Sequence, residues 1–173
     1  MKNFYKLLII FLLIVSFSTT LKAETYFLDF KFIIDKSEAG KKANKLLKKE
    51  LEEGIKKLKD KEKQIQEEEK EIIQQKKILS PEKYKEKIDL LRSKVSTLQK
   101  DRNKILDTVS KKRSKARKVL FETLNPIVKN YMEEKNIKLV LDKKSVLLGS
   151  DELDITNDIM SKLNEKLKSI NLN

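Results

Sequence analysis

The stretch Leu79-Ser80-Pro81-Glu82 interrupts a long, highly charged segment, residues 36–125, that contains no other proline. Serine commonly caps the start of a helix, and proline is tolerated in the first helical turn. The stretch is therefore expected to end one helix and begin another. We predict a first helix over residues 37–79 and a second over 81–125, whose nearly equal lengths suit the two arms of a hairpin. At 1.5 Å per residue, each arm would be roughly 60–65 Å long.

Both arms carry apolar residues at every seventh position. In the first arm these residues are Leu51, Leu58, Ile65, Ile72 and Leu79. In the second arm one set is Tyr84, Leu91, Leu98, Ile105 and Val119, interrupted by Lys112, and the other is Ile88, Val95, Val109 and Ala116, interrupted by Arg102. A sustained seven-residue repeat is typical of a left-handed coiled coil. The two arms are therefore predicted to pack along a continuous seam.

Folding the chain at Ser80 brings together residues whose numbers add to about 163, and this pairing aligns the two repeats. The predicted seam consists of Leu51, Leu58, Ile65, Ile72, Leu91, Leu98 and Ile105. The other core position of the first arm is polar, and there Glu62 is expected to form an ion pair with Arg102 that sets the register. A seam this thin predicts arms that bend or open easily, with Gly54 as a candidate flex point.

The N-terminus has the layout of a secretory signal peptide. Lys2 and Lys6 precede nine apolar residues at 7–15, and residues 16–23 are more polar. A membrane-spanning helix needs about 20 apolar residues, so we expect a signal peptide over residues 1–23, cleaved near Ala23, and not an anchor. The mature protein is predicted to be soluble and periplasmic.

The composition excludes several kinds of chemistry. The chain has no cysteine and no histidine, which rules out disulfides, Ser-His or Cys-His catalysis and the usual zinc sites. Its three glycines stand apart and form no phosphate-binding loop. We expect no enzymatic activity, no cofactor and no metal.

The positive charge is confined to the arms. Residues 36–125 hold 28 Lys and Arg against 16 Asp and Glu, whereas the rest of the mature chain is slightly acidic. The densest basic cluster comprises Lys111, Lys112, Arg113, Lys115, Arg117 and Lys118. These side chains are candidates for binding a client protein, lipopolysaccharide phosphates or an anionic membrane surface. The alternative is a solvated helical face.

Residues 24–35 and 126–173 are expected to form the body from which the hairpin projects. We predict strands over residues 25–28, 137–141 and 145–148, the last two joined by a tight turn. Pro126 is expected to kink the second arm and to precede a short helix over 127–135. A last helix over 155–167 would be capped by Asp154 or Thr156. The predicted class is α+β, predominantly α.

A body of this size is marginal as an independent core. The arms project away from it and cannot cover it. The body is therefore expected to be an oligomerisation domain, completed by further copies of the chain, with the hairpin tip near residues 79–82 at the far end.

The chain resembles the Skp/OmpH family of periplasmic chaperones over its whole mature length. The resemblance rests on Asp29, Ser37, Gly40 and Lys41 near the N-terminus and on residues 139–142, 146–148, 154–156 and 163–164 near the C-terminus. It implies a homotrimer whose strands share a β body and whose hairpins surround a cavity. It also implies an ATP-independent holdase function, in which unfolded outer-membrane proteins are kept from aggregating.

Two other classes of protein share parts of this pattern. A structural or tethering coiled-coil protein of the cell envelope would show the same hairpin, although the strand-bearing body favours an assembled particle. A nucleic-acid-binding protein would show the same net positive charge. The signal peptide, the absence of a groove-reading motif and the acidic residues interspersed along the arms argue against nucleic acid as a partner.

Overall fold

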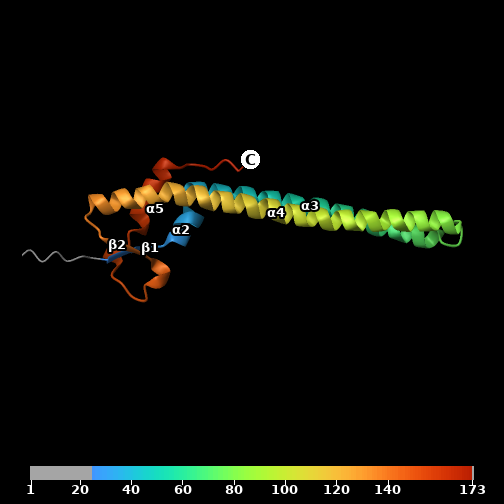
Figure 1. Cartoon of the computed structure of the whole chain (residues 1–173), viewed down its shortest axis with the longest axis horizontal. Helices are drawn as coiled ribbons and strands as arrows, with labels where there is room; N and C mark the ends of the chain where they lie inside the picture. The colour runs from blue at the N-terminus through green and yellow to red at the C-terminus, as the bar shows by residue number, and fades with distance from the viewer. Residues whose placement is uncertain (1–24, 173) are drawn as a thin grey trace, which may run out of the picture.

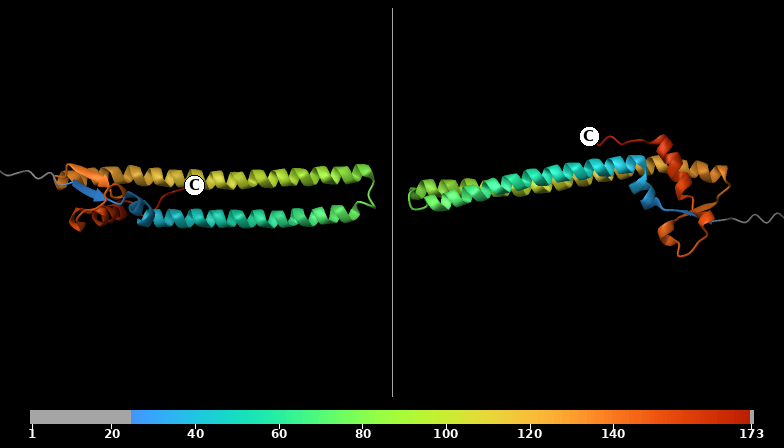
Figure 2. Two further views of the ribbon diagram at one scale, coloured as in Figure 1. Left: turned by 90° about the horizontal axis from the view of Figure 1, so that it is seen from below. Right: turned by 180° about the vertical axis from the view of Figure 1, so that it is seen from behind.

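The structure, a computed structural model, describes residues 25–172; the expected signal peptide lies outside the described residues. The chain forms a strand, β1 (Thr25–Leu28), three helices, α2 (Phe30–Lys36), α3 (Glu38–Gln75) and α4 (Pro81–Glu134), a second strand, β2 (Leu139–Asp142), and a last helix, α5 (Thr156–Lys166). Helices α3 and α4 run side by side as a long hairpin that projects from a small body (Figures 1 and 2). The predicted class, predominantly α with a small β component, is confirmed.

The turn at the tip forms as the sequence predicts. The Ser80 side chain accepts a hydrogen bond from the Lys83 N–H at 3.3 Å, and Pro81 is the first residue of α4. Helix α3 ends at Gln75, earlier than predicted, because the Ile78 and Leu79 N–H groups both donate to the Gln75 carbonyl and close a turn. The residues between Gln75 and Pro81 reverse the chain.

Polar pairs between α3 and α4 fix the register of the hairpin. Three of them are salt bridges, which join Glu50 to Lys112 at 2.8 Å, Lys61 to Asp101 at 2.6 Å and Glu68 to Lys94 at 2.6 Å. The fourth is a hydrogen bond from Lys87 to Gln75 at 2.8 Å. The residue numbers add to 162 in every pair. This register lies one residue from the one that the apolar repeats predict.

The predicted seam is buried unevenly. Leu58, Ile72 and Leu91 are buried, whereas Leu51, Ile65, Leu98 and Ile105 are half-buried. The predicted flex point, Gly54, is also buried, and a Cβ atom there would lie 2.8 Å from the Ile105 side chain. The glycine therefore lets Ile105 pack against the backbone of the opposite arm.

The body differs from its prediction in two places. Helix α4 continues through Pro126 to Glu134, so no separate helix begins at 127. Leu124, Ile127 and Tyr131 are buried on either side of the proline, and their packing against the body holds this helical turn despite the hydrogen bond that proline cannot donate. The second arm and the body therefore share one continuous helix.

The predicted hairpin of strands at 137–141 and 145–148 is also wrong. Strand β2 pairs in parallel with β1, with Thr25 opposite Leu139. Asp142 then accepts a hydrogen bond from the Lys144 N–H at 3.1 Å and starts a 3-10 turn, Lys143–Ser145, which directs the chain away from the sheet. Leu147 and Leu148 follow it in irregular backbone and are almost fully exposed.

A sharp corner between α2 and α3 sets the direction in which the arm leaves the body. Ser37 is fully buried and its side chain accepts a hydrogen bond from the Gly40 N–H at 3.1 Å. A Cβ atom on Gly40 would lie 1.8 Å from the carbonyl oxygen of Ile34. Only glycine fits here without moving the backbone of one of the two helices.

The Gly40→Ala variant is expected to lower the free energy of unfolding by about 2–3 kcal/mol, because the added methyl group meets backbone that cannot move aside. Gly54→Ala is the matched control. Its methyl group would lie 2.8 Å from the Cγ2 atom of Ile105, which is a side chain and not backbone, and alanine is the better helix former by about 1 kcal/mol. Urea unfolding of both variants checks this expectation, and equal losses would contradict it.

Candidate functional site

The side chains of the predicted basic cluster differ in whether they form salt bridges. Lys112 crosses the hairpin to Glu50, Lys111 pairs with Asp107 at 2.7 Å, and Lys118 pairs with Glu122 at 3.8 Å. Among residues 25–172, no salt bridge involves Arg113 or Arg117. The structure thus singles out two arginines, one helical turn apart, from the six residues of the cluster.

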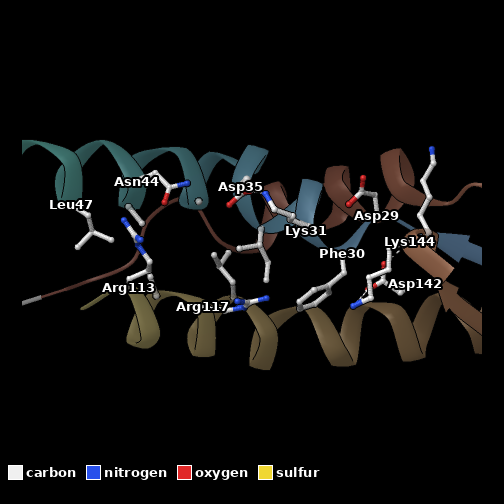
Figure 3. A pocket seen from close by; sticks show the side chains of 16 residues that line it. Asp29, Phe30, Lys31, Asp35, Asn44, Leu47, Arg113, Arg117, Asp142 and Lys144 are labelled. Atoms are coloured by element: carbon white, nitrogen blue, oxygen red, sulfur yellow. Dashed lines mark hydrogen bonds and ion pairs between the residues drawn. The ribbon is translucent and has the colours of Figure 1, made fainter. Parts of the chain in front are cut away.

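Both arginines line a cavity of about 640 Å³ at the base of the hairpin, between α2, α3 and α4. We call this cavity the root groove. Its apolar lining consists of Phe30, Ile34, Ala43, Leu47, Ala116 and Leu120, and its charged and polar lining includes Asp29, Lys31, Asp35, Asn44, Asp142, Lys143 and Lys144. Figure 3 shows Arg113 and Arg117 on the α4 side of the root groove and Asn44 and Asp35 on the opposite side.

The root groove combines apolar walls with charges of both signs. The Lys31 ammonium contacts the Asp35 carboxylate at 2.6 Å, and this contact raises the pKa of Lys31. Arginine carries five N–H donors on a planar group and remains charged at all physiological pH values. Arg113 and Arg117 can therefore offer donors to carboxylates, phosphates or backbone carbonyls of a bound molecule while the groove walls contact its apolar parts.

The shafts of the arms present a similar mixture over a longer distance. Several large apolar side chains are about half exposed or more along α3, the tip and α4, and these are Leu46, Ile55, Ile73, Ile78, Leu90, Val95 and Leu106. They are separated by lysine and glutamate residues, many of which pair along their own helix. The arms thus offer many small apolar contacts and no single large pocket.

A hydrogen-bond network fixes the floor of the root groove to α5. The Thr156 hydroxyl accepts a hydrogen bond from the Asp29 N–H at 2.8 Å and donates one to Asp154, whose carboxylate also contacts the Lys143 ammonium at 2.6 Å. Burial opposes ionisation of Asp154, but the hydrogen bonds from Lys143 and Thr156 outweigh it and lower the pKa of this carboxyl. The Asp154 carboxylate also accepts a hydrogen bond from the N–H of Thr156, the first residue of α5, at 3.0 Å, as expected for a residue at the helix start, although the N-cap position itself is Ile155.

A hydrogen bond joins α4 to α5. The Tyr131 hydroxyl donates a hydrogen bond to Asp158 at 2.5 Å, which raises the pKa of Tyr131 to about 12. Tyr131 is buried in the body core with Leu120, Leu124 and Ile159. This hydrogen bond and the core around Tyr131 hold the end of α4 in the body, while the rest of the helix forms the projecting arm.

The body exposes several large apolar side chains. Phe32, Phe121, Leu139 and Leu141 are between a third and a half exposed, and Leu147 and Leu148 are almost fully exposed. Of these, Phe121, Leu139 and Leu141 border a cavity of about 520 Å³ that is lined by Leu28, Phe30 and residues of α4 and β2. Within residues 25–172 the sheet contains only β1 and β2, so the outer edge of β2 has no strand beside it.

None of the helices in residues 25–172 is both long enough and apolar enough to cross a lipid bilayer. In the same residues, no group of three His, Cys, Asp or Glu side chains is placed to hold a metal ion.

Comparisons with known proteins define the family. Residues 25–163 match the family described as "Outer membrane protein (OmpH-like)". The match covers most of the chain, which therefore belongs to the OmpH-like family. The predicted Skp/OmpH family membership is thus confirmed.

A solved structure shows the same fold. The chain superposes with a TM-score of 0.79 on the crystal structure of a candidate outer membrane chaperone (OmpH-like) from Caulobacter crescentus CB15. The two sequences are 18% identical, and the superposition covers 85% of this chain and 87% of the other. A comparison with the sequences of curated proteins finds no significant match.

The structure places the remaining predicted site residues as follows. Glu62 and Arg102 line one shallow groove on the hairpin, but no salt bridge joins them within the described part of the chain. Both are exposed, and the ion pair at this level is the one between Lys61 and Asp101. The residue numbers of the observed pairs add to 162, whereas those of Glu62 and Arg102 add to 164, so the two side chains are not directly opposite each other.

Sequence analysis did not predict α2, and it therefore missed the root groove. A signal for this helix was present, because Asp29 caps it by accepting a hydrogen bond from the Phe32 N–H at 2.7 Å. Phe30, Ile33 and Ile34 follow with the spacing of a buried helical face. The helix is only seven residues long, and a short apolar run after a strand does not by itself distinguish helix from strand.

The Asp154→Asn variant is expected to lose about 1–2 kcal/mol of stability at neutral pH, because the amide cannot replace the charged hydrogen bonds to Lys143 and Thr156. The folded pKa of Asp154 lies below the ordinary 3.8, so the contribution is present above that value and is lost as the pH falls through the folded pKa. The stabilities of variant and wild type should converge at acid pH. Asp151→Asn, which changes an exposed carboxylate nearby, is the control for thermal unfolding followed across pH. A gap that persists below the folded pKa would contradict the assignment.

Proposed function

We propose that this chain is a periplasmic, ATP-independent holdase that keeps unfolded outer-membrane proteins from aggregating by binding them between its basic arms. The observation that carries the proposal is the surface of the hairpin, where isolated apolar side chains alternate with charges. At its base, Arg113 and Arg117 line the root groove and form no salt bridge within residues 25–172. An unfolded polypeptide presents apolar segments and acidic groups in no fixed order. Many weak contacts of both kinds suit such a ligand.

Membership of the OmpH-like family and the fold shared with a candidate outer membrane chaperone support the proposal. Binding through dispersed contacts also explains release without nucleotide, since each contact can dissociate separately and a folding client withdraws its apolar surface. Lipopolysaccharide or an anionic membrane surface would meet the same arginines. In those cases phosphate would replace the acidic groups of the client.

We also propose that the body associates with further copies of the chain, as a trimer. Exposed Leu139 and Leu141 of β2, with Phe121 at the same cavity, support association, because apolar surface and a free strand edge are both costly to leave in water. Trimerisation would place three hairpins around a shared space. A monomer would have no enclosed space for a client.

The aggregation of an unfolded outer-membrane barrel protein tests the holdase proposal. The mature wild-type chain is expected to suppress light scattering without nucleotide, and a structural spacer would leave the client to aggregate. The double variant Arg113→Glu with Arg117→Glu should bind the client roughly five-fold more weakly, which corresponds to about 1 kcal/mol from two exposed charge contacts.

The control for this variant is Lys111→Glu with Lys118→Glu, which makes the same change in net charge on the same helix but outside the root groove. It is expected to suppress aggregation almost as well as the wild type. Added salt should weaken binding by the wild type more than binding by the arginine variant. Equal losses in both double variants would show that only net charge matters and would contradict the assignment to the root groove.

Light scattering on the mature protein tests the oligomer, with a mass of three chains as the expected result. Leu139→Asp should shift the mass toward one chain, because it places a charge on the exposed apolar face of the body. Leu46→Asp is a matched control on α3, since Leu46 and Leu139 are 49% and 50% exposed. A single-chain mass for the wild type at micromolar concentration would contradict the proposed assembly.

A further inference from the structure

The C-terminal segment, residues 167–172, lies on the hairpin like a bound peptide. It leaves α5 without regular structure and runs back along the arms, on the opposite side of α3 and α4 from α2 (Figures 1 and 2). Leu172 is only 4% exposed although the segment has no regular structure, so the site that it fills is formed by other elements.

That site is a shallow apolar groove between the two arms, which we call the tail groove. Leu172 belongs to a cluster with Ala43 and Leu47 of α3 and with Val109 and Ala116 of α4. The small side chains of the two alanines leave a space between the helices, and Leu47 and Val109 lie beside this space. The tail groove lies behind the root groove and shares Ala43, Leu47 and Ala116 with it, so these residues separate the two binding surfaces.

The segment occupies the tail groove in an extended form. Ile170 and Leu172 face the arms, whereas Ser169 and Asn171 are exposed. Inward residues two positions apart are the pattern of a β-strand, in which successive side chains point to opposite sides. The groove therefore accepts an extended chain with apolar side chains at alternate positions.

The salt bridge between the segment and α3 is exposed to solvent. Lys168 forms a salt bridge with Glu38 at 3.3 Å, but the two side chains are 59% and 47% exposed, and such a pair contributes little. The burial of Ile170 and Leu172 must offset the entropy lost by ordering the segment, and the two effects are of similar size. Because the free energy gained by burial is close to the free energy lost by ordering, the segment can exchange with a competing ligand.

We propose that the tail groove binds extended segments of unfolded polypeptides with apolar residues at alternate positions, and that the C-terminal segment is a resident ligand which the client displaces. The inference rests on the proposed holdase function and names a site for it. The selectivity matches the proposed clients, because strands of outer-membrane barrels alternate apolar and polar residues. When no client is present, the segment covers the apolar groove and prevents the arms of different particles from associating through it.

Thiol labelling of the mature chain tests the displacement, since the natural sequence contains no cysteine. The Leu172→Cys variant carries a thiol in the tail groove, and Ser169→Cys carries an exposed thiol on the same segment as a control. Without client, the thiol at position 172 should react at least ten-fold more slowly than the one at 169. A bound, urea-unfolded outer-membrane barrel protein should accelerate labelling at 172 several-fold and leave labelling at 169 unchanged.

Equal reactivity of the two thiols without client would overturn the proposal, because the segment would not be seated. Client that co-elutes with the chain but does not change labelling at 172 would also overturn it, and the holdase function would stand.

A second measurement does not depend on the holdase function. A peptide of residues 168–173 is added at millimolar concentration to a chain that ends at Leu167 and to the full chain, with the methyl resonances of Ala43 and Ala116 observed by NMR. Both resonances should shift on titration in the shortened chain only, where the groove is empty. The absence of a shift in the shortened chain would contradict a peptide-binding groove whether or not the protein acts as a holdase.

Discussion

The close contact between Gly40 and the Ile34 carbonyl is the constraint on which the rest of the structure depends. It allows α2 and α3 to meet at a corner around the buried Ser37 hydroxyl, so that the first arm leaves the body beside α4. The root groove is the space enclosed by this corner and α4, and its position follows from that contact. A side chain at position 40 would push α3 away from α2 and change both the direction of the arm and the walls of the groove.

The hairpin combines a firm base with weakly joined arms. At the base, α4 passes through the body as one continuous helix, fixed to α5 by Tyr131 and by the core around Leu124 and Ile159. Farther out, several seam positions are only half-buried, and salt bridges at the edges of the hairpin set the register. Exposed salt bridges specify alignment better than they add stability. We therefore expect the arms to separate or bend more readily than the body unfolds.

The features that depend on local sequence could be predicted, and those that depend on tertiary contacts could not. Ser80-Pro81 and the seven-residue repeats predict the hairpin because capping and helix periodicity are local properties. The strand expected at 145–148 does not form, because the Asp142 side chain accepts a hydrogen bond from the Lys144 N–H and turns the chain there. The apolar composition of residues 145–148 gives no sign of this turn. The separate helix expected after Pro126 does not form, because burial of Leu124 and Ile127 around the proline holds one continuous helix. Arg113 and Arg117 were within the predicted basic cluster, but only the structure separates them from Lys112, which crosses to Glu50.

Under the proposed function, the two grooves would place client binding at the base of the hairpin, where Tyr131 joins α4 to α5. Sites held by tertiary contacts lose less entropy on binding than flexible ones, so we expect the first contact with an unfolded chain there and not at the tip. The arms would then close on the segments that follow, each through a weak and reversible contact. The C-terminal segment fits this order of events, because it covers apolar surface at the base and leaves the charged shafts free. Under the proposed function, binding at the base and closure of the arms are therefore two separate steps, and changes in the root groove affect the first of them.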